Sequence, residues 1–288
     1  MEQRFVSAKS SIESLRDNGF QNTAYALAEL LDNSIQAKAS RIEVAYIEVP
    51  SMVKQRTTSA VQEICVLDDG IGMSSETLLM SMSFGEGLNR TDKSGMGKFG
   101  MGLPNSSISQ CRRLDVWSWQ KGQPPHKTYL DVLEMAGGKL EFVPLPEVND
   151  IPERYKSLFP EGLPPSGTLI VWSDLDRLRW KTGKSIHRHC EQLIGRMYRR
   201  FIADGTIRIE SKIYQPVSDN KLEQIAAFEF KANDPLYLFK NTSLPELPGE
   251  YKNESFFEKL DEVKLPVKYR QIDGSFAEEE ITIRSSIV

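Results

Sequence analysis

The sequence predicts a globular α/β fold, on the evidence of three local patterns. Apolar residues at Leu27, Leu30 and Leu31 follow helical spacing. Residues 41–49 alternate between apolar and polar side chains, as a half-buried strand does, and residues 61–67 contain an unbroken apolar run, as a buried strand does. The chain has 288 residues, 40% hydrophobic and 26% charged, which is ordinary for one large or two average soluble domains.

Charge and cysteine usage exclude several classes of protein. The net charge of −4 gives no bulk electrostatic attraction to nucleic acid, although a local basic patch stays open. Three scattered cysteines, an odd number, argue against a disulfide framework. Charged residues interrupt the N-terminus, and no apolar stretch is long enough to cross a membrane. We therefore expect a cytoplasmic protein, or a nuclear one in a eukaryote, with no membrane partner.

The helix expected around residues 26–33 carries polar groups beside its apolar stripe. Asn22 or Thr23 can cap its start. Glu29 and Asn33 are four residues apart and therefore project from the same face. An amide oxygen suits Mg²⁺, which prefers oxygen ligands, and a carboxylate can take a proton from an attacking water. An ordinary polar helix surface would have the same pattern, so the later motifs have to distinguish it from a metal-phosphate site.

Further strands and helices are expected along the rest of the chain. Residues 144–165 contain six prolines and are expected to form a surface excursion. A hairpin is expected around Asp273-Gly274. Strands are expected at 114–120, 127–135, 167–172, 207–213, 263–270 and 280–287, and an amphipathic helix at 185–201.

A second motif follows the apolar strand 61–67. Asp69 is followed by Gly70 and Gly72, so that a planar ring could approach the backbone there. An acid at this place can accept a hydrogen bond from an exocyclic amine. Strand alternation points the neighbouring Asp68 the opposite way, so Asp69 is the expected contact.

A third motif lies in a glycine-rich run over residues 84–105. Six glycines and three basic residues predict a mobile loop with free backbone amides that can surround an anion. The pattern Gly95-x-Gly97-x-x-Gly100 lacks the strand that a dinucleotide fingerprint needs. His187, His189 and Cys190 share one amphipathic helix and are expected to be ordinary helix residues. Trp117 and Trp119 lie on one strand face and are expected in the core.

Taken together, the motifs resemble the GHKL superfamily of gyrase, the large heat-shock chaperone, histidine kinases and MutL. The ordered set is Glu29-x-x-x-Asn33, Asp69-Gly70-x-Gly72, Gly97-x-x-Gly100-x-Gly102 and Gly167-Thr168. Within that superfamily the helix at residues 26–33 and the Lys-Phe-Gly-x-Gly-Leu run at 98–103 are most similar to MORC-type ATPases. The resemblance covers about residues 15–210.

The resemblance implies a Bergerat ATP-binding fold, with a mixed β-sheet covered by helices on one face. It implies ATP and Mg²⁺ as ligands, with Glu29 as general base and Asn33 as the Mg²⁺ ligand. Asp69 would bind the adenine amine. Gly72, Met73 and Thr168 would complete the adenine pocket, and Gly97, Lys98, Phe99, Gly100, Met101 and Gly102 would wrap the phosphates.

The resemblance also implies an ATP-dependent homodimer and places the ATP-binding domain at residues 1–215. Residues 216–288 would begin a second, transducer-like domain that continues beyond the sequence. The expected activity is slow, Mg²⁺-dependent ATP hydrolysis that drives lid closure and dimerisation on DNA or a protein partner. A nucleotide-gated clamp with little hydrolysis and a chaperone-like ATPase are the alternatives.

Overall fold

The computed structural model describes residues 8–20, 22–53, 56–84, 102–234, 258–259, 262–271 and 274–287. Eight strands form one sheet in the order β5-β4-β3-β6-β2-β1-β7-β8. Neighbouring strands are antiparallel except β1 and β7, which are parallel, so the sheet is mixed, as expected. Its strands are β1 (Arg41–Val53), β2 (Arg56–Asp68), β3 (Arg113–Trp119), β4 (His126–Asp131), β5 (Glu147–Val148), β6 (Gly167–Ser173), β7 (Arg208–Ser218) and β8 (Lys221–Glu229).

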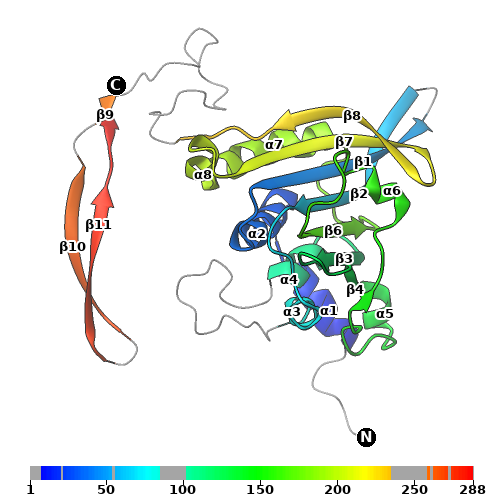
Figure 1. The fold of residues 1–288 in the computed structure, drawn as a ribbon, viewed down its shortest axis with the longest axis horizontal. Coiled ribbons are helices and arrows are strands. Elements are labelled where there is room, and N and C mark those ends of the chain that lie inside the picture. The colour runs from blue at the N-terminus through cyan, green and yellow to red at the C-terminus, as the bar shows by residue number, and fades with distance from the viewer. Residues whose placement is uncertain are drawn as a thin grey trace, which may run out of the picture.

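Helices cover one face of this sheet and enclose the larger of two hydrophobic cores (Figure 1). The central helix is α2 (Thr23–Gln36), which contacts α4 (Gly102–Ile108) and α7 (Gly183–Met197). Its predicted stripe is confirmed, since Leu27, Leu30 and Leu31 are fully buried. The other helices of the domain are α1 (Ala8–Asp17), α3 (Ser75–Ser81), α5 (Val132–Ala136), α6 (Glu153–Lys156) and α8 (Arg199–Ala203).

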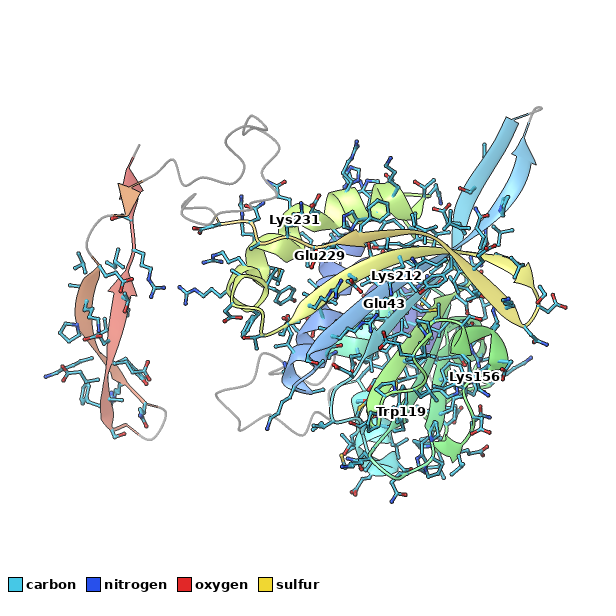
Figure 2. The ribbon with its side chains drawn as sticks, turned by 45° about the horizontal axis from the view of Figure 1, so that its top comes forward. Glu43, Trp119, Lys156, Lys212, Glu229 and Lys231 are labelled. Atoms are coloured by element: carbon cyan, nitrogen blue, oxygen red, sulfur yellow. The ribbon has the colours of Figure 1, made fainter. Side chains whose placement is uncertain are left out.

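The opposite face of the sheet has a smaller core of its own. Trp117 and Trp119 lie there with Ile151, Tyr155 and Leu158, so the prolines of 144–165 mark a segment that covers the sheet. Beside this core, Figure 2 shows Glu43 of β1 next to Lys212 of β7. The two side chains form a buried ion pair, and the hydroxyl of Tyr214 donates to Glu43 Oε1 at 2.8 Å.

The strand predicted at 127–135 and the helix predicted at 185–201 are both shorter than expected. The strand predicted at 127–135 stops at Asp131, whose carboxylate accepts from the backbone N–H groups of Leu133 and Glu134 and caps α5. The helix predicted at 185–201 breaks at Tyr198, where α7 gives way to α8.

The sheet continues past the expected domain boundary at residue 215. That position lies inside β7, and β8 pairs with β7 as the edge strand of the same sheet. Beyond it, β10 (Val263–Arg270) and β11 (Phe276–Ile283) pair as the expected hairpin, although the second strand, expected at 280–287, begins and ends four residues earlier. Strand β9 (Glu258–Lys259) pairs with β12 (Ser286–Ile287). Among the described residues, no helix is both long and apolar enough to cross a membrane.

Candidate functional site

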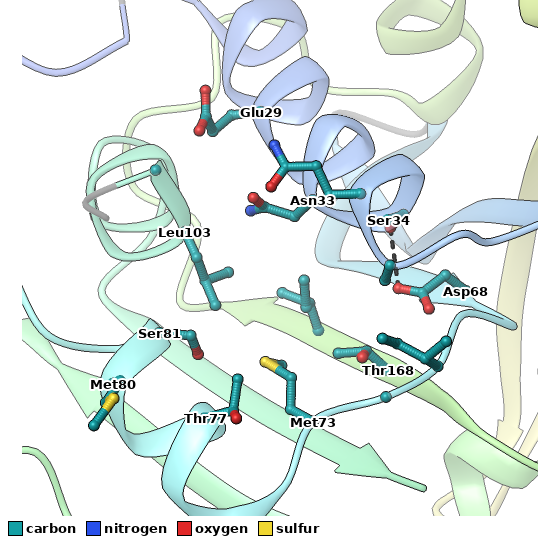
Figure 3. Close-up of a pocket in the computed structure, with 16 residues that line it drawn as sticks. Glu29, Asn33, Ser34, Asp68, Met73, Thr77, Met80, Ser81, Leu103 and Thr168 are labelled. Atoms are coloured by element: carbon teal, nitrogen blue, oxygen red, sulfur yellow. Dashed lines mark hydrogen bonds between the residues drawn. The ribbon is translucent and has the colours of Figure 1, made fainter. Parts of the chain in front are cut away.

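A cavity of about 390 Å³ lies between α2, α3, α4 and the sheet (Figure 3). The predicted site residues Glu29, Asn33, Gly72, Met73, Gly102 and Thr168 all line it. They come from four separate parts of the chain, which the fold brings together around one space. The remaining lining residues are Ser34, Gln36, Ala37, Asp68, Ile71, Thr77, Met80, Ser81, Leu103 and Ile170.

Helix α2 holds Glu29 and Asn33 at the cavity because its ends are firmly fixed. Asn22 is the N-cap, and its Oδ1 accepts from the backbone N–H groups of Ala24 at 3.0 Å and Tyr25 at 3.2 Å. At the other end, the N–H of Ile71 donates to the carbonyl of Ala37 at 2.9 Å. The turn after β2 is thereby tied to the end of the helix that carries the polar pair.

The carboxylate of Glu29 is half-buried and lies against the start of α4. A Cβ added to Gly102 would lie 1.9 Å from Glu29 Oε1, so glycine is needed for this close approach. No described residue forms a hydrogen bond with the Glu29 side chain. Burial raises the pKa of Glu29, and the nearby carboxylate of Asp32 raises it further. The group is therefore a better base than an exposed glutamate.

Asp68 is the buried acid on the sheet side of the cavity. Ser34 Oγ donates to its Oδ2 at 3.0 Å, and the backbone N–H of Gly70 donates to its Oδ1 at 2.9 Å. Its exposed fraction is 6%. Burial raises the pKa of Asp68 to about 6, although both hydrogen bonds oppose the increase.

The prediction that Asp69, and not Asp68, faces the cavity is wrong by one residue. Asp69 does not line the cavity: its carboxylate accepts from the backbone N–H groups of Ser40 and Arg41 and from the hydroxyl of Ser40. The side chains alternate as expected, but the cavity lies on the helix-covered face of the sheet, where β2 directs Ile64, Val66 and Asp68. Residues 64–67 are buried on both faces, so their sequence contains no sign of which face that is.

Gly72 and Thr168 shape the wall next to Asp68. Gly72 has a φ of +67°, and a Cβ there would lie 1.9 Å from the carbonyl oxygen of Trp119. The N–H of Met73 donates to Ser118 Oγ at 2.8 Å, and that hydroxyl lies 3.0 Å from the hydroxyl of Thr168. Backbone and hydroxyl groups therefore fix the turn where it borders the cavity.

The other predicted phosphate-binding residues fall outside the described residues, namely Gly97, Lys98, Phe99, Gly100 and Met101. Only Gly102 of that motif is described, at the start of α4.

Sequence reasoning missed Ser34, which has a recognisable sequence signal. It follows Leu27, Leu30 and Leu31 at a spacing of three on the apolar stripe, yet it is polar and 2% exposed. A small hydroxyl residue within such a stripe indicates a buried polar partner, and here that partner is Asp68. Gln36 was also missed; its Nε2 is buried and has no hydrogen-bond partner.

His187, His189 and Cys190 all lie on α7, as expected. His187 stacks on Phe228 and approaches Ser211 Oγ at 2.9 Å, and burial lowers its pKa to about 4. No cluster of three or more His, Cys, Asp or Glu side chains able to hold a metal occurs in the described part of the chain.

Comparison with known proteins shows what this chain is similar to. Residues 21–147 match the family described as histidine kinase-, DNA gyrase B- and HSP90-like ATPases. A crystal structure described as the N-terminal domain of a DNA repair protein aligns with 96% of this chain and 70% of its own, with a TM-score of 0.51 and 16% identity. At that identity the alignment supports the fold alone.

This match confirms the resemblance to the GHKL superfamily over residues 21–147. Within it, the chain is similar to ATPase MORC2B of Mus musculus and ATPase MORC2 of Homo sapiens. Each is 36% identical to it over 84 residues, which is 29% of this chain. That match spans only 8% of the length of each relative.

Proposed function

We propose that this chain binds ATP in the α2 cavity and hydrolyses it with the help of Mg²⁺. The observation that carries the proposal is Glu29, a half-buried carboxylate that lines the cavity, has a raised pKa and has no hydrogen-bond partner among the described residues. A free carboxylate with a raised pKa suits a general base.

Asp68 is the proposed contact of the adenine amine, in place of Asp69. It is the buried acid of the cavity, and its hydrogen bonds from Ser34 and Gly70 keep it in place. Thr168 pairs with Asp68 across β6 and β2, so its hydroxyl borders the same end of the cavity. The glycine turn at Gly70–Gly72 leaves room for a planar ring beside the backbone.

Asn33 fits the role of Mg²⁺ ligand. Its amide lines the cavity one helical turn from Glu29 and has no hydrogen-bond partner among the described residues. A single amide oxygen is sufficient, because Mg²⁺ at nucleotide sites is held mostly by phosphates and water. The ion, when bound, neutralises charge on the phosphates. Glu29 takes the proton of the attacking water.

Substitution of Glu29 by alanine tests the proposal. Glu29→Ala is expected to keep ATP binding, because the adenine contacts remain, and to lose about 10²–10⁴-fold in turnover. Calorimetric titration with ATP and phosphate release by the same protein measure the two quantities. An equal loss of binding and hydrolysis would contradict the role of Glu29 as base. A wild-type chain that binds ATP and releases no phosphate would favour the nucleotide-gated clamp.

We further propose that ATP closes the glycine-rich segment 85–102 over the phosphates and that closure drives homodimerisation. The support is the sequence of that segment together with the family match, since residues 85–101 lie outside the described residues. Among them, Arg90, Lys93 and Lys98 supply positive charge suited to phosphates.

A local charge asymmetry favours DNA, rather than protein, as the partner of this module. Residues 177–208 contain nine basic and two acidic residues in a chain of net charge −4. Four exposed side chains that form no ion pair with a described residue make up what we call the α7 ridge: Lys184, Arg188, Arg196 and Arg200. Three of them recur at spacings of four and eight along α7, so they lie along one side of the helix. Such a surface attracts a phosphate backbone.

A further inference from the structure

Tyr198 contacts the catalytic turn of α2 from the junction between α7 and α8. Its ring is 2% exposed. Its hydroxyl oxygen lies 2.7 Å from Asp32 Oδ1 and 2.8 Å from the carbonyl oxygen of Ala28. These two acceptors flank Glu29 in the sequence, so one hydroxyl spans the single turn that carries the proposed base.

Glu29 and Asp32 are two carboxylates three residues apart, and only Asp32 has a hydrogen-bond partner among the described residues. Residues at this spacing are neighbours on a helix surface. Asp32 has the hydroxyl of Tyr198 as partner, while Glu29 has no hydrogen-bond partner among the described residues. Glu29 lines the cavity, and Asp32 does not.

We propose that Tyr198 is a positioning residue for ATP hydrolysis. By holding the Asp32 carboxylate against the α7–α8 junction, it keeps this second acid out of the cavity. Glu29 is then left as the one carboxylate of α2 that faces the attacking water. The inference rests on the proposed function, and Tyr198 itself does not touch the substrate.

The position of Tyr198 also ties the catalytic turn to the chain segment that follows the sheet. The N–H of Asn233 donates to the carbonyl of Gly195 at 3.0 Å, three residues before Tyr198. A Cβ at Gly195 would lie 2.3 Å from the carbonyl oxygen of Lys231, so the two backbones are in close contact there. The tyrosine is therefore held in a rigid, packed part of the helix, as a positioning residue has to be.

Tyr198→Phe removes the hydroxyl and keeps the buried ring. The expected result is a fall in kcat of about tenfold, the lower end of the 10–100-fold that loss of a partner orienting a metal ligand costs at metal sites. KM for ATP should change by less than about twofold, because no nucleotide contact is lost. Steady-state phosphate release over a range of ATP concentrations measures both.

Tyr214→Phe is the matched control. Tyr214 is also 2% exposed and also donates to a carboxylate, Glu43, at 2.8 Å, but on the opposite face of the sheet. It should lose a similar amount of thermal stability with kcat unchanged. If both variants lower kcat equally, the effect is a general loss of stability and the inference is wrong.

A double-mutant cycle with Asp32 tests whether Tyr198 affects kcat through Asp32. If Tyr198 acts through Asp32, then Tyr198→Phe should lower kcat in the wild-type background and leave it unchanged in an Asp32→Ala background. If Tyr198→Phe lowers kcat by the same factor in both backgrounds, the two residues act independently and the inference is overturned. Should the phenylalanine variant not fold, Asp32→Ala alone decides: because this variant has no second acid to be kept out of the cavity, an unchanged kcat supports the role given to Tyr198, and a loss of kcat at constant KM overturns it.

The two proposals fail in different ways. A wild-type chain without Glu29-dependent phosphate release overturns the ATPase proposal and this inference together. A wild-type chain that hydrolyses ATP, with Tyr198→Phe equally active, overturns the role of Tyr198 alone.

Discussion

Asp68 and Asp69 are neighbours in the chain but have opposite surroundings. Asp68 is buried at the cavity with a pKa raised to about 6 by burial, whereas the carboxylate of Asp69 holds the backbone where β1 begins. The first is therefore expected to serve ligand binding and the second to serve the structure.

Asp68→Asn should weaken ATP binding by roughly ten- to a hundredfold, because a hydrogen bond to a charged acceptor is worth about 1.5–3 kcal/mol. Guanine presents a carbonyl where adenine has its amine, so the variant should also bind GTP better relative to ATP. In the wild type, ATP affinity should fall as the pH drops through about 6, where Asp68 takes up a proton. Calorimetry with ATP and GTP at pH 5.5 and 7.5 measures these effects. Asp69→Asn is the control and should alter nucleotide preference little.

Asp68→Asn should weaken ATP binding but should stabilise the folded chain in the absence of nucleotide. The pKa of Asp68 is higher in the folded chain, about 6, than the ordinary 3.8, so the folded state binds this proton more tightly. The stabilisation that comes from protonated Asp68 is complete below about pH 4 and is lost as the pH rises through about 6. At pH 7.5, Asp68→Asn should therefore gain on the order of 2–3 kcal/mol, the equivalent of about two pKa units. Urea unfolding at pH 5 and pH 7.5 checks this, and a variant no more stable than wild type at pH 7.5 would contradict it.

At the scale of single elements, the contact between α2 and the start of α4 sets the geometry of the proposed base. Gly102→Ala would bring a methyl group to 1.9 Å from Glu29 Oε1. The carboxylate is the far end of a flexible side chain, so it can turn aside while the fold is kept. We expect an unchanged melting temperature and a fall in kcat of about tenfold or more, since misplacement of a catalytic group by about 1 Å can cost 10²-fold.

The matched control for this element is Gly205→Ala, in the loop after α8. No atom lies within 4 Å of a Cβ there, although its φ of +75° makes the substitution mildly strained. That variant should lose some stability and no turnover. If Gly102→Ala is as active as wild type, Glu29 does not act from the observed position.

At the scale of the whole molecule, ATP is expected to convert the chain from a monomer into a dimer. Sedimentation should give the 32.7 kDa monomer alone and twice that mass with a non-hydrolysable ATP analogue. Hydrogen exchange of residues 85–102 should slow under the same conditions, because closure and dimerisation are proposed to be one event. Identical exchange with and without the analogue would mean that this segment is not a lid.

The α7 ridge predicts salt-dependent binding of DNA. Replacement of Lys184, Arg188, Arg196 and Arg200 by glutamine should weaken binding of a labelled DNA duplex. It should also reduce the slope of log affinity against log salt by about 3.6, since each of the four phosphate contacts contributes about 0.9. Fluorescence anisotropy at several salt concentrations measures this, with ATP hydrolysis without DNA as the control. An unchanged slope would exclude the ridge as a DNA contact.

The sequence by itself determined the elements of this protein whose pattern is local. The α2 stripe and the pairing of Glu29 with Asn33 follow from spacing within one helix. Strand β2 and the turn at Gly70–Gly72 follow from a short run of residues. Because these motifs occur in a characteristic order, the sequence also predicted the superfamily and a mixed sheet.

Tertiary structure alone decided which side chains meet. Strand β2 is buried on both faces, so only the position of the helices shows that Asp68, and not Asp69, faces the cavity. The parallel pairing of β1 with β7 joins residues more than 150 positions apart, and β8 follows it into the same sheet beyond the expected boundary. Tyr198 reaches Asp32 across 166 residues. Such contacts depend on how whole elements pack, and no spacing within one element records them.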